Sequence, residues 1–314
     1  MERLLYKTNR ASIWLFAAIA TLAIGTFYKT YVKTDETTLG VITYEQAKEI
    51  ARDVVNEKKE NVLHLLDLDN EKWEEAKKTL QPGYTEPVNI DHNCFVKKEK
   101  MSPEIKQSVH NVLENPDVKS AFGITSIAEE DFKIKATREN GKNIYFVLST
   151  PSQINSWAAS SEKTVYIVPE EMKRLSISSS ELEASIGHEL GHILSEHNLE
   201  DQWLMSEYKK NLKAKDSVAF QSALNEWRRA QEVEADIVGT FNNGDWANAL
   251  AASFQNNQRQ IASYQLDPSH PPTSDRINYL TTLYSTAQQK ADKNELPETI
   301  IETIKQAASP MKIA

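Results

Sequence analysis

The sequence predicts an α+β fold that is mainly helical, with a small sheet between two helical sections. Apolar residues recur at helical spacing from Tyr44 to Leu80 and almost throughout the chain after Ser178, whereas residues 132–168 contain short runs typical of strands. At 314 residues the chain can bury a core without disulfides, and its one cysteine, Cys94, can form none internally.

The N-terminal segment is the most apolar part of the chain. Residues Ala11 to Tyr28 carry no charge, and as a helix they would span about 27 Å, close to the hydrocarbon thickness of a bilayer. Basic residues precede the segment, which favours a cytoplasmic N-terminus. We therefore expect residues 1–38 to hold a single-pass membrane anchor and a linker, with the body on the extracytoplasmic side.

Two alternatives remain for this segment. It can be a cleaved signal peptide with small residues at Ala23 and Gly25, which would leave a secreted or periplasmic protein. It can also be a buried helix of a soluble domain.

Residues 39–101 are expected to form a helical section of their own. The apolar stripes of Tyr44–Leu80 predict a pair of helices, and Gln81-Pro82-Gly83 interrupts the pattern. No residue in this section indicates chemistry.

The main domain is expected at residues 102–284, followed by a helical tail at 285–314. Ser102 and Pro103 suit a helix start, because serine caps the first turn and proline fits the first helical position. A hairpin turn is expected at Glu139–Lys142. Three runs are expected to be strands: Phe132–Lys135, Ile144–Leu148 and Thr164–Val168.

The segment His188-Glu189-Leu190-Gly191-His192 carries the clearest chemical signal. The two histidines lie one helical turn apart, so both imidazoles can reach one metal ion. Glu189 points near the open side of the metal, where it can take a proton from bound water. Glycines at 187 and 191 each cost about 1 kcal/mol relative to alanine in a helix interior. We therefore expect another segment to approach this helix closely.

A catalytic zinc site of this kind needs a third protein ligand. His197 lies about 140° round the helix from His192, so we interpret it as a solvated residue at the helix end. Glu232 and Asp236 share a helix face, so one can bind metal while the other bonds a ligand histidine. Glu234 is expected to face away. The predicted ligands of one zinc ion per chain are His188, His192 and Glu232.

With these motifs the sequence resembles the zinc metallopeptidases that include HtpX, BepA and the CAAX prenyl endopeptidases. Their pattern is His-Glu-x-x-His followed, on a second helix, by Glu-x-x-Ala-Asp, here Glu232 to Asp236. The resemblance covers roughly residues 102–284 and implies a zincin-like peptidase domain. Two further segments resemble parts of the family: Asn155, Ser156, Trp157 and Ala158 its edge strand, and Ser269-His270-Pro271-Pro272 with Arg276 its His-Pro segment and arginine.

The resemblance implies roles for these residues. The edge strand Asn155–Ala158 would bind polypeptide substrates backbone to backbone. His270 would lie close to the metal, either steadying the oxyanion or capping the ion as a gate. Arg276 would orient a carboxylate or the substrate carbonyl; the alternative is a surface helix residue.

These expectations describe a membrane-tethered zinc endopeptidase that hydrolyses unfolded or damaged proteins in protein quality control. The alternative is a gated holdase with minor proteolysis, but Glu189 favours the enzyme because a pure binder needs no general base. The net charge of −9 argues against a nucleic-acid partner. Unlike HtpX and the CAAX enzymes, the chain has no further segment after Tyr28 that is long and apolar enough to cross a membrane.

Overall fold

The structure is a computed structural model. It describes residues 44–83, 96–150, 158–160, 163–210, 217–240, 244–260, 270–271, 273–288 and 305–306. All of these belong to one compact unit, Gly40–Ala314. None of the helices in these ranges has the length and apolar character needed to span a bilayer. The predicted anchor at residues 1–38 lies outside the described residues.

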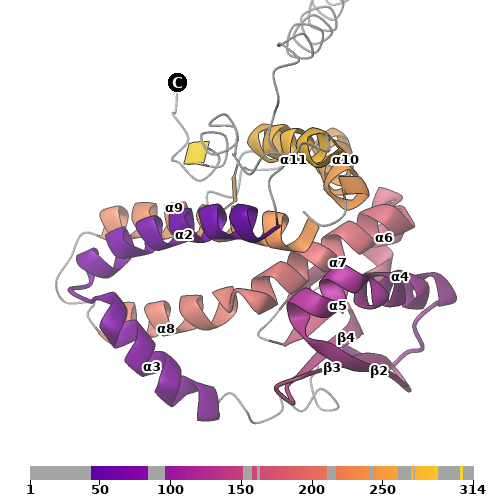
Figure 1. The fold of residues 1–314 in the computed structure, drawn as a ribbon, viewed down its shortest axis with the longest axis horizontal. Coiled ribbons are helices and arrows are strands. Elements are labelled where there is room, and N and C mark those ends of the chain that lie inside the picture. The colour runs from indigo at the N-terminus through magenta and orange to yellow at the C-terminus, as the bar shows by residue number, and fades with distance from the viewer. Residues whose placement is uncertain are drawn as a thin grey trace, which may run out of the picture. The chain divides into compact units, whose positions relative to one another are not determined.

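The predicted pair of N-terminal helices is present as α2 (Tyr44–Leu65) and α3 (Asn70–Gly83). The second helix runs three residues beyond Leu80 and ends at Gly83, so the Gln-Pro-Gly run forms its last turn. Helix α2 buries Ala51, Val54 and Val55 of its apolar stripe. This stripe packs along helix α9, and the two helices run side by side (Figure 1).

The sheet contains six strands in the described residues, in the order β2-β3-β4-β6-β5, with β1 paired to the end of β4. Strands β4 and β6 are parallel and the other pairs are antiparallel. The predicted hairpin turn joins β3 to β4, and Gly141 adopts a φ of 76° there. The bounds are β1 Val96–Lys97, β2 Ile124–Glu130, β3 Lys133–Arg138, β4 Asn143–Ser149, β5 Ala158–Ser160 and β6 Thr164–Ile167.

Most of the described residues belong to helices, which confirms a mainly helical α+β fold. Ser102 caps α4 as predicted, accepting a hydrogen bond from the Ile105 amide. Ser178 and Glu181 form a capping box at the start of α7. The bounds are α4 Pro103–Glu114, α5 Pro116–Phe122, α6 Pro169–Leu175, α7 Ser179–Leu194, α8 His197–Lys210, α9 Ser217–Thr240, α10 Gly244–Gln260 and α11 Thr273–Gln288.

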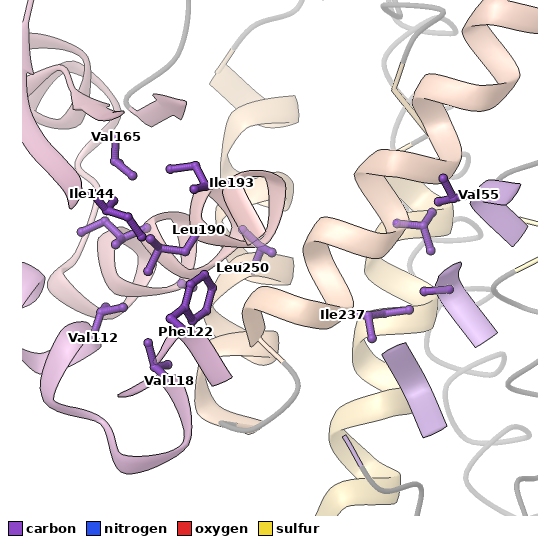
Figure 2. Packing of buried hydrophobic residues seen from close by; sticks show 14 of the residues in the cluster. Val55, Val112, Val118, Phe122, Ile144, Val165, Leu190, Ile193, Ile237 and Leu250 are labelled. Carbon is purple, nitrogen blue, oxygen red and sulfur yellow. The ribbon is translucent and has the colours of Figure 1, made fainter. Parts of the chain in front are cut away.

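Helix α7 lies at the centre of the core. Its apolar residues Leu190 and Ile193 belong to the same buried cluster as Ile144 and Val165 of the sheet (Figure 2). Helices α4, α9 and α10 also pack against α7. A helix buried on most sides is held firmly, which suits one that must place side chains accurately.

Candidate metal centre

Helices α7 and α9 touch through their backbones. A Cβ atom added at Gly191 would lie 2.5 Å from the carbonyl oxygen of Ala235, and one at Gly187 would collide with Gly239. The expectation that another segment approaches this glycine pair is therefore confirmed, and that segment is α9. Only glycine permits this approach, which brings the histidines of α7 within reach of the carboxylates of α9.

The structure brings His188, His192 and Glu232 together. The two histidine Nε2 atoms are 3.1 Å apart, and they lie 3.5 Å and 3.3 Å from the two carboxylate oxygens of Glu232. Tetrahedral zinc with bonds of about 2.1 Å requires donor atoms about 3.4 Å apart. The donor types and their spacing therefore fit a zinc ion. The side chains are 11–13% exposed, so water can reach the site.

Asp236 supports His188 from the side opposite the site. Its Oδ1 lies 2.8 Å from His188 Nδ1, which leaves Nε2 to face the other ligands. Asp236 also accepts two hydrogen bonds from Arg276, at 2.9 Å and 2.6 Å, and one from the hydroxyl of Tyr279. Burial favours the neutral acid, but Arg276 and His188 outweigh it and lower the pKa of Asp236 to about 2.

Arg276 is buried, contrary to the alternative of a surface helix residue, and it contacts two carboxylates. Besides Asp236 it reaches Glu232, with Nη1 3.4 Å from Oε2. Burial disfavours ionised Glu232, yet the neighbouring His270 and His192 lower the pKa of Glu232 well below its usual value. Arg276 is thus placed to orient carboxylates.

His197 supports the other histidine, and its interpretation as a solvated residue is wrong. It is 3% exposed, and its Nδ1 lies 2.9 Å from Nδ1 of His192. The reason is a break in the helix: α7 is capped at Ser195, Glu196 has a φ of 58°, and α8 begins at His197. The helical angle from His192 therefore does not continue to His197.

Glu234 completes this side of the site. Its Oε2 lies 2.9 Å from Nε2 of His197. Burial lowers the pKa of His197, so the ring is neutral at neutral pH and carries one proton. No local pattern in the sequence pointed to this contact, because it joins residues 37 positions apart.

The family comparison agrees with this geometry. Residues 123–284, just over half of the chain, match the sequence model of Peptidase family M48. The chain belongs to family M48. This confirms the predicted family and makes the protein a metallopeptidase by descent. No curated protein and no solved structure matches the chain.

Two other residues of the M48 motifs lie near the ligands. His270 is half-exposed, and its Nε2 lies 3.4 Å from Oε1 of Glu232. Glu189 is half-buried and close enough to His192 to raise the pKa of that imidazole together with Glu232, against the effect of burial. Both are reachable from solvent, as groups that meet a substrate must be.

The expected substrate strand is described only in part. Asn155, Ser156 and Trp157 lie outside the described residues, whereas Ala158 begins β5. Among the described strands β5 lies at one edge of the sheet, where it pairs with β6 alone. It lies beside α7. The M48 fold thus places a sheet edge next to the helix that carries His188 and His192.

Proposed function

We propose that this M48 peptidase is a zinc-dependent endopeptidase that hydrolyses unfolded or damaged proteins. The observation that carries the proposal is the convergence of two imidazole nitrogens and one carboxylate at zinc-like spacing, next to the half-buried Glu189. Three protein ligands leave the fourth position of a tetrahedral site to water, which is the arrangement of a catalytic centre.

Each residue of the site would have a separate role in the reaction. His188, His192 and Glu232 would hold zinc, which when bound supplies a Lewis acid for water and for the scissile carbonyl. Glu189 accepts a proton from the attacking water and returns it to the leaving amine. Asp236 keeps the metal-facing nitrogen of His188 unprotonated, and Arg276 holds Asp236 and Glu232 in place.

The sheet edge supports an extended polypeptide as the substrate. A free edge offers unpaired amide and carbonyl groups, and a peptide added there is recognised mainly through its backbone. Backbone recognition tolerates many sequences but requires an extended segment, which folded proteins seldom expose. This favours unfolded or damaged proteins as substrates.

The activity can be tested on casein. We expect cleavage that a chelator abolishes and zinc restores. The Glu189→Gln variant should retain zinc but lose roughly a hundredfold or more in rate, because it lacks the general base. Equal turnover by this variant would contradict the assigned mechanism. Binding of casein without any cleavage by the unmodified chain would instead support a holdase.

His270 can be assigned by one substitution. As an oxyanion donor its loss should slow cleavage by about a hundredfold or more, which is typical of one lost donor. As a gate that caps the metal, its loss should accelerate cleavage. Both roles would be excluded if His270→Ala cleaved casein at the unmodified rate while His192→Ala did not cleave it.

The location of the protein is a separate proposal that rests on the apolar segment Ala11–Tyr28. We propose a membrane anchor with the peptidase body outside the cytoplasm. Protease added to spheroplasts should digest the body, and the chain should sediment with membranes. A soluble chain with a new N-terminus near Thr26 would indicate a cleaved signal peptide instead.

A further inference from the structure

A row of buried polar side chains leads from the metal centre to the N-terminal helix α2. It begins with the contact between His192 and His197, at 2.9 Å, and continues from His197 to Glu234, also at 2.9 Å. Arg52 of α2 donates to the same oxygen of Glu234 at 3.3 Å. Its other terminal nitrogen donates to Glu200 of α8 at 3.2 Å.

The acids in this row depend on cations that lie outside the M48 segment. Glu200 and Glu234 are each 2% exposed, and a buried carboxylate without a cation is costly. Their ion-pair partners among the described residues are Arg52, which reaches both, and Lys59, whose Nζ is 3.3 Å from Glu200. Two carboxylates within residues 123–284 thus meet two cations of α2.

The packing of α2 holds these cations in place. Arg52 and Lys59 are seven residues apart and therefore project from the same side of the helix. The flanking residues Val55 and Val62 are fully buried, and α2 lies along the α9 backbone that carries Glu234. The apolar contact between α2 and α9 thus fixes the position along α9 at which Arg52 meets Glu234.

The proton positions along this row follow from metal binding. If His192 binds zinc through Nε2, its Nδ1 carries the proton and donates a hydrogen bond to Nδ1 of His197. His197 must then carry its own proton on Nε2, which donates to Glu234. Each ring has one possible tautomer, and the carboxylate of Glu234 determines the orientation of both.

We propose that α2 is a positioning element of the metal centre, which acts through Arg52, Glu234 and His197 on the ring of His192. The inference rests on the zinc site proposed above. It assigns a role to the section at residues 39–101, where the sequence indicated no chemistry. Arg52 is a positioning residue: it holds Glu234, which orients His197, which in turn orients the ligand His192.

The test compares zinc affinity among full-length variants, measured by competition with a chelating dye. Arg52→Met keeps the apolar stem of the side chain but removes its charge, and we expect zinc affinity about tenfold weaker, the lower end of the usual effect for partners of a ligand. Arg52→Lys keeps the charge and should recover most of the affinity.

Arg228→Met is the matched control. Arg228 of α9 pairs with Asp201 of α8 at 2.8 Å and 2.9 Å, and its side chain is 31% exposed, against 32% for Arg52. It therefore also ties α8 to α9, but none of its contacts with the described residues reaches a ligand. Its loss should leave zinc affinity unchanged. It should lower the unfolding temperature of the metal-free protein by less than the loss of Arg52, because Asp201 is 29% exposed whereas the acids paired with Arg52 are buried.

The outcomes separate this inference from the proposed function. Equal zinc affinity in Arg52→Met and the unmodified chain would overturn the role of α2 and leave the zinc site intact. Equal weakening by Arg228→Met would also overturn it, because the effect would then be general destabilisation. Absence of zinc binding by the unmodified chain would contradict the proposed function itself.

Discussion

The two histidines of the metal centre are supported in different ways. Behind His188 stands Asp236, with Arg276 and Tyr279 as its donors, and all of these residues lie within the M48 segment. Behind His192 stands neutral His197 and then Glu234, whose cation, Arg52, comes from a helix outside that segment. One side of the site is therefore complete within residues 123–284, and the other is completed by a helix outside that segment.

The difference is also electrostatic. Asp236 is a charged acid in direct contact with a ligand, and the pKa of Arg276 is raised despite burial by its contact with Asp236. On the other side a neutral imidazole separates the carboxylate from the ligand. We therefore expect the His188 side to govern stability and metal binding together, and the His192 side to affect mainly the orientation of one ring.

Asp236→Ala should have the largest effect on both stability and zinc affinity. It leaves the buried Arg276 without its main partner, which costs about 3–5 kcal/mol in the free energy of unfolding. Zinc affinity should also fall by about a hundredfold, because His188 loses its orienting acceptor. Chemical denaturation and dye competition would measure the two losses. A variant as stable as the unmodified chain would show that Asp236 is not a central support.

Gly191→Ala should act on both sides at once. Alanine normally stabilises a helix interior by about 1 kcal/mol relative to glycine. Here the added methyl group would meet the backbone of Ala235 and push α7 from α9, so we expect a loss of about 1–3 kcal/mol. The sign of the change in unfolding free energy is the decisive observation, since a gain in stability would mean that the helices are not in backbone contact.

His197→Phe should give the smallest change in the free energy of unfolding, and it tests how far the supports of His188 and His192 differ. The substitution fills the space but removes the acceptor for His192, so zinc affinity should fall by about tenfold, less than for Asp236→Ala. The unfolding free energy of the metal-free protein should change less than in that variant. A larger effect on zinc than that of Asp236→Ala would reverse the order of the two supports.

The sequence was sufficient for features that depend on local patterns. The cap at Ser102, the hairpin turn and the close approach at Gly191 follow from spacing and residue type, and the structure contains each of them. Strand β2 was missed because most of its residues are exposed and show no apolar alternation. Periodicity gives no signal for a strand that buries few of its side chains.

The supports of the metal ligands needed tertiary information. His197 was misplaced because the left-handed turn at Glu196 ended the helix on which its angle was calculated. The contact of Arg52 with Glu234 joins residues 182 positions apart, and no local pattern connects them. A ligand motif can be recognised within one helix. The residues that orient the ligands come from distant parts of the chain, as Arg52 does when it pairs with buried Glu234.

We propose that His188, His192 and Glu232 hold one catalytic zinc ion. The most direct test is metal analysis of the purified full-length chain beside its His192→Ala variant. We expect about one zinc per chain in the former and little in the latter, because the two remaining ligands would hold zinc too weakly for it to be retained through purification. Full zinc occupancy in His192→Ala would contradict it.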